Sequence, residues 1–242
     1  MRGGNISGSL EISQLGNEAE GVMRLGIVGA GMIGATMARL WSEAGHDVRL
    51  ASRHPEQLAA LVEQLGERVS AGPAQDAAVF GQVVMLTVPL TAVPDLAPDL
   101  APLLAGKIVL DTGNAYEQRD GAVAREARAH PRGSAGWAAA RFSGARWVKA
   151  FNSVYFKTLL SEAHREGDRV GIPLASDFPS SLETVARLVG DAGFDPVIVG
   201  SLERGKEFEP DTPPYNTGMS GRDLRNLFNW NAMQQRQSNG TL

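Results

Sequence analysis

A glycine-rich turn between an apolar run and an amphipathic run constrains this chain most. Leu25-Gly26-Ile27-Val28 is followed directly by Gly29-Ala30-Gly31-Met32-Ile33-Gly34, and apolar residues then recur at helical spacing to about Ala44. In a strand, G-x-G-x-x-G turn and helix, the first glycine permits the tight turn and the second lets a phosphate approach the backbone. The third glycine lets helix and strand pack closely. We therefore expect a doubly wound fold that binds a dinucleotide pyrophosphate at this helix N-terminus.

The rest of the chain alternates short apolar runs with longer amphipathic ones. Val83–Val88 is continuously apolar, as expected of a strand buried on both faces of a parallel sheet. Pro94, Pro98 and Pro102 predict a connection made of broken helical turns. Further strands are expected at 47–51, 69, 107–111, 147–150, 170–175 and 196–199, and helices at 55–65, 73–80 and 179–192. This alternation predicts an α/β, Rossmann-type doubly wound fold with a mainly parallel sheet.

The 242 residues suffice for one substantial domain with flanking segments. Residues 1–22 are rich in Gly, Ser, Asn and Glu and lack the apolar stretch of a signal peptide, so we expect a disordered N-terminal extension. Residues 23–201 are the expected dinucleotide-binding Rossmann domain. Residues 202–242 are expected to form a short polar C-terminal tail with room for one short helix around Arg222–Phe228.

Composition narrows the classes of function. A net charge of −4 gives no overall basic surface for nucleic acid. The chain has no cysteine, which excludes disulfides, iron–sulfur clusters and thiol catalysis and favours a reducing compartment, the cytoplasm. No apolar run approaches the ~20 residues that cross a bilayer, so we expect no membrane association. None of His46, His54, His130 and His164 stands at metal-ligand spacing from another, and no metal site is predicted.

The residues after the second expected strand distinguish NAD from NADP. An NAD-binding protein usually places Asp or Glu about 20 residues beyond the glycine turn, to bind the ribose 2′-hydroxyl. Here Ser52-Arg53-His54 stand instead. Ser52 can donate to a 2′-phosphate, Arg53 can pair with it as a planar fork, and His54 can assist. This predicts NADP(H) as cofactor, and a solvated basic turn is the alternative.

Three later strands end in sequences that should meet at one edge of the sheet. Ligands of such sheets bind at the carboxyl ends of the strands, near the point where the strand order reverses. We expect the segments after the fourth and sixth strands to cradle the nicotinamide and Asn114 to orient it, although each alone could be a simple turn. The predicted cofactor-binding residues are Gly29, Gly31, Met32, Ile33, Gly34, Ser52, Arg53, His54, Thr87, Val88, Pro89, Asn114, Ala150, Phe151 and Asn152.

These motifs resemble the NADPH-dependent F(420) reductase-like family and are similar to the cytosolic NADPH-binding domain of the STEAP metalloreductases. The resemblance runs from about Met23 to Ser201, and Pro210–Tyr215 resembles a tail of bacterial members. It implies hydride transfer between NADP(H) and a deazaflavin (coenzyme F(420)) or flavin ring. Residues 112–114 and the connection 116–146 are closer to the metalloreductases, which leaves the electron acceptor open. The residues that carry the resemblance are Gly29–Gly34, Ala51–Pro55, Leu86–Pro89, Ala105–Asp111 and Val148–Asn152.

Two other functions stay open at this point. Hydride transfer to a flavin-like ring needs little from side chains, because the cofactors carry the chemistry. A reductase of small carbonyl or imine compounds needs a proton donor, and Lys149 is the one candidate, with a cradle or structural role as the alternative. Such an enzyme would also be expected to have a sizeable helical domain after the Rossmann fold, for which residues 202–242 are too few. A non-catalytic NADP(H) sensor is the other function. The expected partners are a small-molecule electron acceptor and a second copy in a homodimer that closes the ligand edge.

Overall fold

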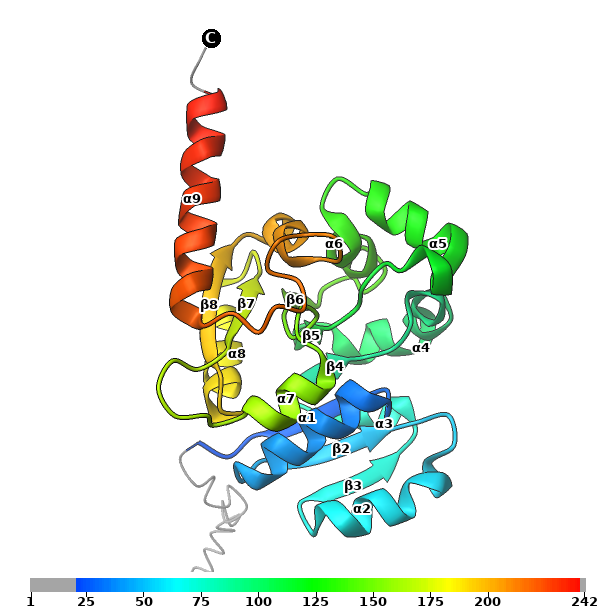
Figure 1. Cartoon of the computed structure of the whole chain (residues 1–242). Helices are drawn as coiled ribbons and strands as arrows, with labels where there is room; N and C mark the ends of the chain where they lie inside the picture. Colours follow the sequence, from blue (N-terminus) through cyan, green and yellow to red (C-terminus); the bar gives the residue numbers. More distant parts are fainter. Residues whose placement is uncertain (1–20, 240–242) are drawn as a thin grey trace, which may run out of the picture.

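The computed structural model describes residues 21–239, so the extension expected at residues 1–22 lies almost wholly outside the described residues. Within that range one eight-stranded sheet has the order β3-β2-β1-β4-β5-β6-β7-β8 (Figure 1). The order reverses between β1 and β4, which places the turn after β1 beside the turn after β4. The predicted α/β fold is confirmed. The strands are β1 (Arg24–Val28), β2 (Asp47–Ala51), β3 (Val69–Gly72), β4 (Val83–Leu86), β5 (Ile108–Asp111), β6 (Arg146–Lys149), β7 (Gly171–Ala175) and β8 (Asp195–Gly200).

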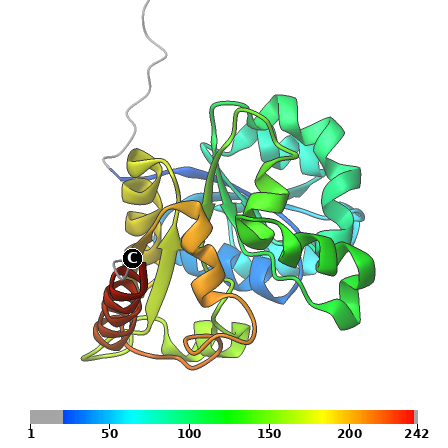
Figure 2. The ribbon, with the colours of Figure 1, turned by 90° about the horizontal axis from the view of Figure 1, so that it is seen from above.

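Helices cover both faces of this sheet (Figures 1 and 2). Helices α1, α2, α7 and α8 contribute to the packing on one face, and α3, α4, α5 and α6 to that on the other. The helices are α1 (Met32–Glu43), α2 (Ala59–Leu65), α3 (Ala74–Phe80), α4 (Val93–Leu104), α5 (Glu117–Ala129), α6 (Gly133–Ala139), α7 (Phe156–Glu162), α8 (Pro179–Asp191) and α9 (Gly221–Asn239), with short 3-10 segments η1 (Pro55–Leu58), η2 (Leu90–Ala92) and η3 (Leu202–Phe208).

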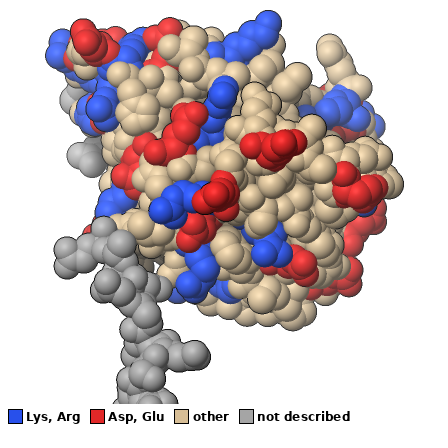
Figure 3. Space-filling view, turned by 90° about the horizontal axis from the view of Figure 1, so that it is seen from below, with Lys and Arg blue, Asp and Glu red and all other residues tan. Residues whose placement is uncertain are grey.

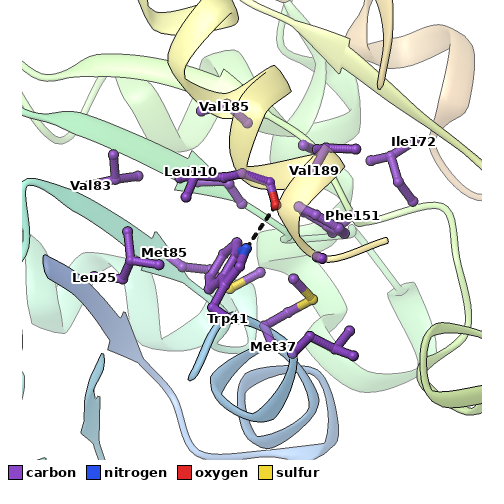
Figure 4. Packing of buried hydrophobic residues seen from close by; sticks show 14 of the residues in the cluster. Leu25, Met37, Trp41, Val83, Met85, Leu110, Phe151, Ile172, Val185 and Val189 are labelled. Carbon is purple, nitrogen blue, oxygen red and sulfur yellow. Dashed lines mark hydrogen bonds between the residues drawn. The ribbon is translucent and has the colours of Figure 1, made fainter. Parts of the chain in front are cut away.

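The sheet has a hydrophobic core on each face, because successive side chains of a strand point to opposite faces. In β4, Val83 and Met85 pack on one face while Val84 and Leu86 pack on the other, which explains the continuous apolar run. Trp41 of α1 lies in the first cluster, and its indole N–H donates to the Leu188 carbonyl oxygen at 2.9 Å (Figure 4). This bond lets a large aromatic side chain be buried without an unsatisfied donor.

The sheet changes direction after β6. Strands β1 to β6 are parallel, whereas β6 pairs with β7 in antiparallel orientation through Lys149 and Ala175, and β7 and β8 are parallel to each other. The long edge strand β8 therefore runs opposite to the strands that form the expected ligand edge.

The expectation of broken helical turns around Pro94, Pro98 and Pro102 was wrong. Helix α4 runs without interruption from Val93 to Leu104 and contains two of these prolines in its interior. All three prolines are exposed, while Ala97, Leu100 and Leu104 are buried against the sheet. The missing backbone donors therefore lie on the outer side of the helix, and burial of the inner side offsets their loss.

The C-terminal segment also differs from the expected tail. Its helix α9 extends over Gly221–Asn239, well beyond Arg222–Phe228, and stands beside β8 (Figure 2). Leu202, Phe208, Leu224 and Phe228 of this segment are buried, in part against β7 and β8. Apolar residues spaced among polar ones thus attach the segment to the sheet, a pattern that its polar composition conceals.

The surface bears on the expected partners. No helix within residues 21–239 combines the length and apolarity that spanning a bilayer requires. On the face seen from below, acidic and basic side chains are mixed, and neither sign covers a large continuous area (Figure 3).

Candidate functional site

The three glycines of the turn after β1 have three different surroundings. Gly29 has φ +115°, and a Cβ there would lie 2.3 Å from the Thr87 carbonyl oxygen. A Cβ at Gly34 would lie 1.9 Å from the Gly29 carbonyl oxygen. A Cβ at Gly31 would meet no heavy atom within 4 Å. Gly29 thus permits close approach of the turn after β4, and Gly34 permits close packing of the helix on the glycine turn, whereas Gly31 faces open space.

Helix α1 begins directly at this open space. Its N-cap residue is Gly31, and no side chain caps the first backbone N–H groups. Free N–H groups and the positive end of the helix dipole together favour an anion there. Met32 is 66% exposed at the same place, and Ile33 lines a cavity described below. The arrangement can bind a pyrophosphate without any charged side chain.

Ser52, Arg53 and His54 follow β2 next to the glycine turn, because the Gly29 N–H donates to the Ala51 carbonyl oxygen at 3.0 Å. The Ser52 hydroxyl accepts from the His54 N–H at 3.2 Å, and His54 Nδ1 lies 3.4 Å from a Glu56 carboxylate oxygen. Arg53 is exposed, and its guanidinium has no partner among residues 21–239. An unpaired arginine beside a hydroxyl suits a phosphate.

A cavity of about 260 Å³ lies where β4, β5 and β6 end. Seven of the predicted residues line it, namely Ile33, Thr87, Val88, Pro89, Asn114, Phe151 and Asn152. Ala150 is buried beside the cavity and does not line it. Strand ends separated by many residues are therefore brought together, as their position at one sheet edge predicted.

Asn114 and Asn152 connect the loops after β5 and β6. Asn114 Nδ2 donates to the Asn152 carbonyl oxygen at 2.7 Å, and Asn152 Nδ2 donates to Asn114 Oδ1 and to the Phe208 carbonyl oxygen, both at 3.0 Å. Both residues are buried, so these bonds are shielded from water. The pair fixes both loops and the C-terminal segment relative to one another.

Phe151 has a left-handed backbone with φ 59°, which is costly for a non-glycine residue. Its ring is fully buried and makes edge-to-face contacts with Trp41 and Phe194, at 6.1 and 6.3 Å between ring centroids. Core packing therefore maintains a strained loop at the cavity wall.

Several residues of the cavity were not predicted. Tyr116, Arg119, Tyr155, Phe156, Tyr215 and Asn216 line it together with Thr112, Gly113 and Val154. The hydroxyls of Tyr116 and Tyr215 hydrogen-bond to each other, although 99 positions separate the two residues. Burial raises the pKa of the Tyr215 hydroxyl, and its hydrogen bond to Tyr116 raises it further. The only signal in the sequence was the resemblance of residues 210–215 to a bacterial tail.

Arg119 lies behind the tyrosines. Its guanidinium is 4.8 Å from the centroid of the Tyr116 ring, within cation–π distance. It also donates to the Asn114 carbonyl oxygen at 3.0 Å and pairs with the buried Asp120 at 2.7 Å. The cavity end formed by these residues is rich in hydrogen-bond donors.

Lys149 does not line the cavity. Its side chain is 0% exposed, and its ammonium pairs with Asp111, its register neighbour on β5, at 3.1 Å. It also donates to the Gly113 carbonyl oxygen and to the Ser134 hydroxyl, while Asp111 accepts from the Gly113 N–H at 2.8 Å. The ion pair thus holds both polar groups of the Gly113 backbone, next to Asn114. Among the described residues no group of three or more His, Cys, Asp or Glu side chains is arranged to bind a metal.

Comparisons with known proteins indicate which proteins this chain is similar to. Residues 24–115 match the model of a family described as "NADP oxidoreductase coenzyme F420-dependent". Metalloreductase STEAP3 of Rattus norvegicus is 28% identical over 186 residues, which cover 77% of this chain. The match covers 36% of that relative, so the chain spans only about a third of its length.

Two solved structures are similar over most of the chain. The hypothetical protein SMa0349 of Sinorhizobium meliloti has a TM-score of 0.71 with 26% identity, covering 82% of this chain and 95% of the other. A protein of Arthrobacter sp. FB24, described as a candidate F420-dependent NADP reductase, has a TM-score of 0.66 with 20% identity, covering 76% and 87%. The second likeness shows the shared fold alone.

The resemblance expected from the sequence motifs is confirmed by the match over residues 24–115. This part of the chain is similar to the domain that the model of the coenzyme F420-dependent NADP oxidoreductases describes.

Proposed function

We propose that NADP(H) binds along the carboxyl edge of the sheet, from the end of β2 to the end of β6. Gly29, Gly31, Met32, Ile33 and Gly34 would hold the pyrophosphate. The observation that carries this proposal is the open space at Gly31 in front of the uncapped N-terminus of α1.

The two ends of the cofactor would then have separate sites. Ser52, Arg53 and His54 would hold the 2′-phosphate, supported by the unpaired Arg53 guanidinium. The nicotinamide would lie in the cavity at the strand ends, against Thr87, Val88 and Pro89 on one side. Asn114, Phe151 and Asn152 would form the other side, with Ala150 buried behind them and the two asparagine amides fixing the orientation of the ring.

We propose a deazaflavin, such as coenzyme F(420), or a flavin as the second substrate. Aromatic side chains of Tyr116, Tyr155, Phe156 and Tyr215 line the cavity and suit a planar ring, and no carboxylate or lysine of the described residues lines it. The bound nicotinamide supplies or accepts the hydride. The protein's residues position the two rings and exclude water, which is what such a transfer requires of them.

Reduction of a small carbonyl or imine compound is the second candidate function. The two tyrosine hydroxyls in the cavity favour it, because a phenol can protonate the product of hydride addition. An NADPH-oxidation assay with FMN, FAD, a 5-deazaflavin, a quinone, and simple carbonyl and imine compounds separates the candidates. Turnover only with flavin-type rings supports the first, and turnover only with carbonyls or imines replaces it with the second. NADPH binding without turnover of any acceptor would favour the non-catalytic sensor.

We further propose that the chain acts as a homodimer in the cytoplasm. Met32, Tyr155 and Leu160 are 66%, 49% and 44% exposed, although they are large and apolar, and all three lie near the glycine turn or the cavity. The cysteine-free composition supports a reducing compartment. Light scattering of the purified chain measures its oligomeric state directly, and a monomer at micromolar concentration would contradict the proposed homodimer.

A further inference from the structure

We propose that the Tyr116–Tyr215 hydroxyl pair donates one hydrogen bond to a ring carbonyl of the electron acceptor and thereby selects acceptors that carry one. The inference rests on the proposed function and adds the chemical feature that the site would recognise. It gives a role to two residues on segments far apart in the chain.

The first argument is a count of protons. The two hydroxyls carry two protons, and their mutual hydrogen bond uses one of them. Asn114 Nδ2 lies 3.2 Å from the Tyr116 oxygen and 3.4 Å from the Tyr215 oxygen, but an amide nitrogen only donates. Asn216 makes a further side-chain hydrogen bond to Tyr215 that lowers the pKa of its hydroxyl, which is the effect of a donor. The other hydrogen bonds of the described residues include no acceptor for the second proton. One O–H group at the cavity is therefore left for a ligand.

The second argument concerns charge. The cavity end formed by the tyrosines contains the Asn114 amide donors and the Arg119 guanidinium, and within residues 21–239 no Asp or Glu lines the cavity. Burial raises the pKa of Tyr215, with the opposing influences of Asn216 and Arg119 smaller, so this hydroxyl keeps its proton at physiological pH. Asp120 pairs with Arg119 and compensates its charge, but a donor-rich end still favours an electron-rich oxygen over a cation or another donor.

The third argument concerns placement. Tyr215 belongs to the C-terminal segment, and the next residue fixes that segment to the cavity, because the Asn216 N–H donates to the Ser153 carbonyl oxygen at 2.8 Å. Tyr116 directly precedes α5 and is fixed by Asn114 and Arg119. Both hydroxyls are thus preorganised by contacts that exist before any ligand binds, as electrostatic stabilisation requires.

The chemistry of hydride transfer explains what the donor would do. The C4–H bond of the dihydronicotinamide breaks and a new bond from hydrogen to the acceptor ring forms, so the cofactor is oxidised and the ring reduced. The electron pair that enters the ring increases the negative charge on a conjugated carbonyl oxygen. A hydrogen bond to that oxygen is stronger in the transition state than before it and therefore accelerates the reaction. The hydroxyl keeps its proton, and the reduced ring takes any further proton from solvent.

The test compares acceptors with and without a ring carbonyl. Tyr215→Phe, Tyr116→Phe and the double variant are assayed with FMN and a 5-deazaflavin, and with N-methylphenazinium, a planar acceptor that has no carbonyl. We expect kcat/KM for the carbonyl-bearing rings to fall about tenfold, which is the scale of one hydrogen bond. Both kcat/KM for N-methylphenazinium and the affinity for NADPH should stay within about twofold of the wild-type values. The double variant should lose little more than either single variant, because the two hydroxyls act as a unit.

Asp211→Asn is the matched control, because Asp211 lies in the same C-terminal segment, is 78% exposed and, among residues 21–239, forms its ion pair with Arg128 alone. It should leave all rates unchanged. Equal losses for all acceptors, or no loss for any, would overturn the inference.

Binding of oxidised FMN and 5-deazaflavin to the NADP⁺ complex, followed by flavin fluorescence, is the second readout and should weaken in the tyrosine variants. A wild-type chain that neither reduces nor binds these rings would refute the proposed function together with the inference. If the wild type and all three tyrosine variants reduce FMN and the 5-deazaflavin at the same rate, the inference alone is refuted.

Discussion

Replacement of Lys149 by methionine tests whether the structure assigns this residue correctly. Lys149 and Asp111 form a buried pair, with 0% and 5% of their side chains exposed. Methionine fills similar space but leaves the Asp111 carboxylate without its counter-charge, and the Gly113 carbonyl and Ser134 hydroxyl without a donor. Removing one partner of a buried ion pair costs about 3–5 kcal/mol. Because a domain of this size has only about 5–15 kcal/mol of stability, the loss is large, and we expect Tm to fall by about 10–15 °C.

The effect on turnover should be much smaller. Lys149 reaches the cavity only through Gly113 and the adjacent Asn114, so its loss should displace a loop without removing a proton donor. We expect less than a ~30-fold decrease in kcat with a flavin-type acceptor and no new pH dependence, since losing a positioned general acid typically costs about 10²–10⁴.

The double variant Lys149→Met/Asp111→Asn is the matched control. Asparagine keeps an acceptor for the Gly113 N–H and removes the unpaired charge, so at least about 2 kcal/mol of the lost stability should return. Urea unfolding followed by tryptophan fluorescence measures the free energy of unfolding of the wild type, the single variant and the double variant. A single variant within about 1 kcal/mol of wild type would refute the buried-pair argument. A thousandfold loss of turnover with stability and NADPH affinity intact would instead make Lys149 a catalytic acid.

Three further predictions follow from the cofactor and acceptor sites. Gly31→Val should abolish NADPH binding while circular dichroism stays unchanged, because the new side chain occupies the open space before α1; normal affinity would place the pyrophosphate elsewhere. Wild type should bind NADPH at least about tenfold more tightly than NADH, and Arg53→Ala should remove this preference in a calorimetric titration; equal wild-type affinities would refute the phosphate site. Because the pKa of Tyr215 is raised above its ordinary 10.0, kcat/KM for a flavin-type acceptor should stay constant from about pH 7 to 9.5. If kcat/KM instead decreases as the pH is raised from 7 to about 9, and this decrease is absent in Tyr215→Phe, the prediction is wrong.

The sequence determined the parts of the site that depend on local sterics. At Gly29 and Gly34 any side chain would collide with the backbone, and at Gly31 a side chain would obstruct a bound ligand. A short motif therefore suffices to predict all three. The strand ends were also predictable, because parallel strands bring their carboxyl ends to one edge. Seven of the predicted residues accordingly line one cavity.

Only the tertiary structure decided which side chains face that cavity. The sequence could not show that Lys149 would have Asp111 as its register neighbour, since pairing between β5 and β6 is a property of the assembled sheet. It gave little reason to join Tyr116 to Tyr215, which 99 positions separate, nor to expect the polar C-terminal segment to bury Phe208 and Phe228. Local sequence patterns reflect backbone sterics and the periodicity of helices and strands. Contacts between residues far apart in the sequence depend instead on where the folded chain places each segment.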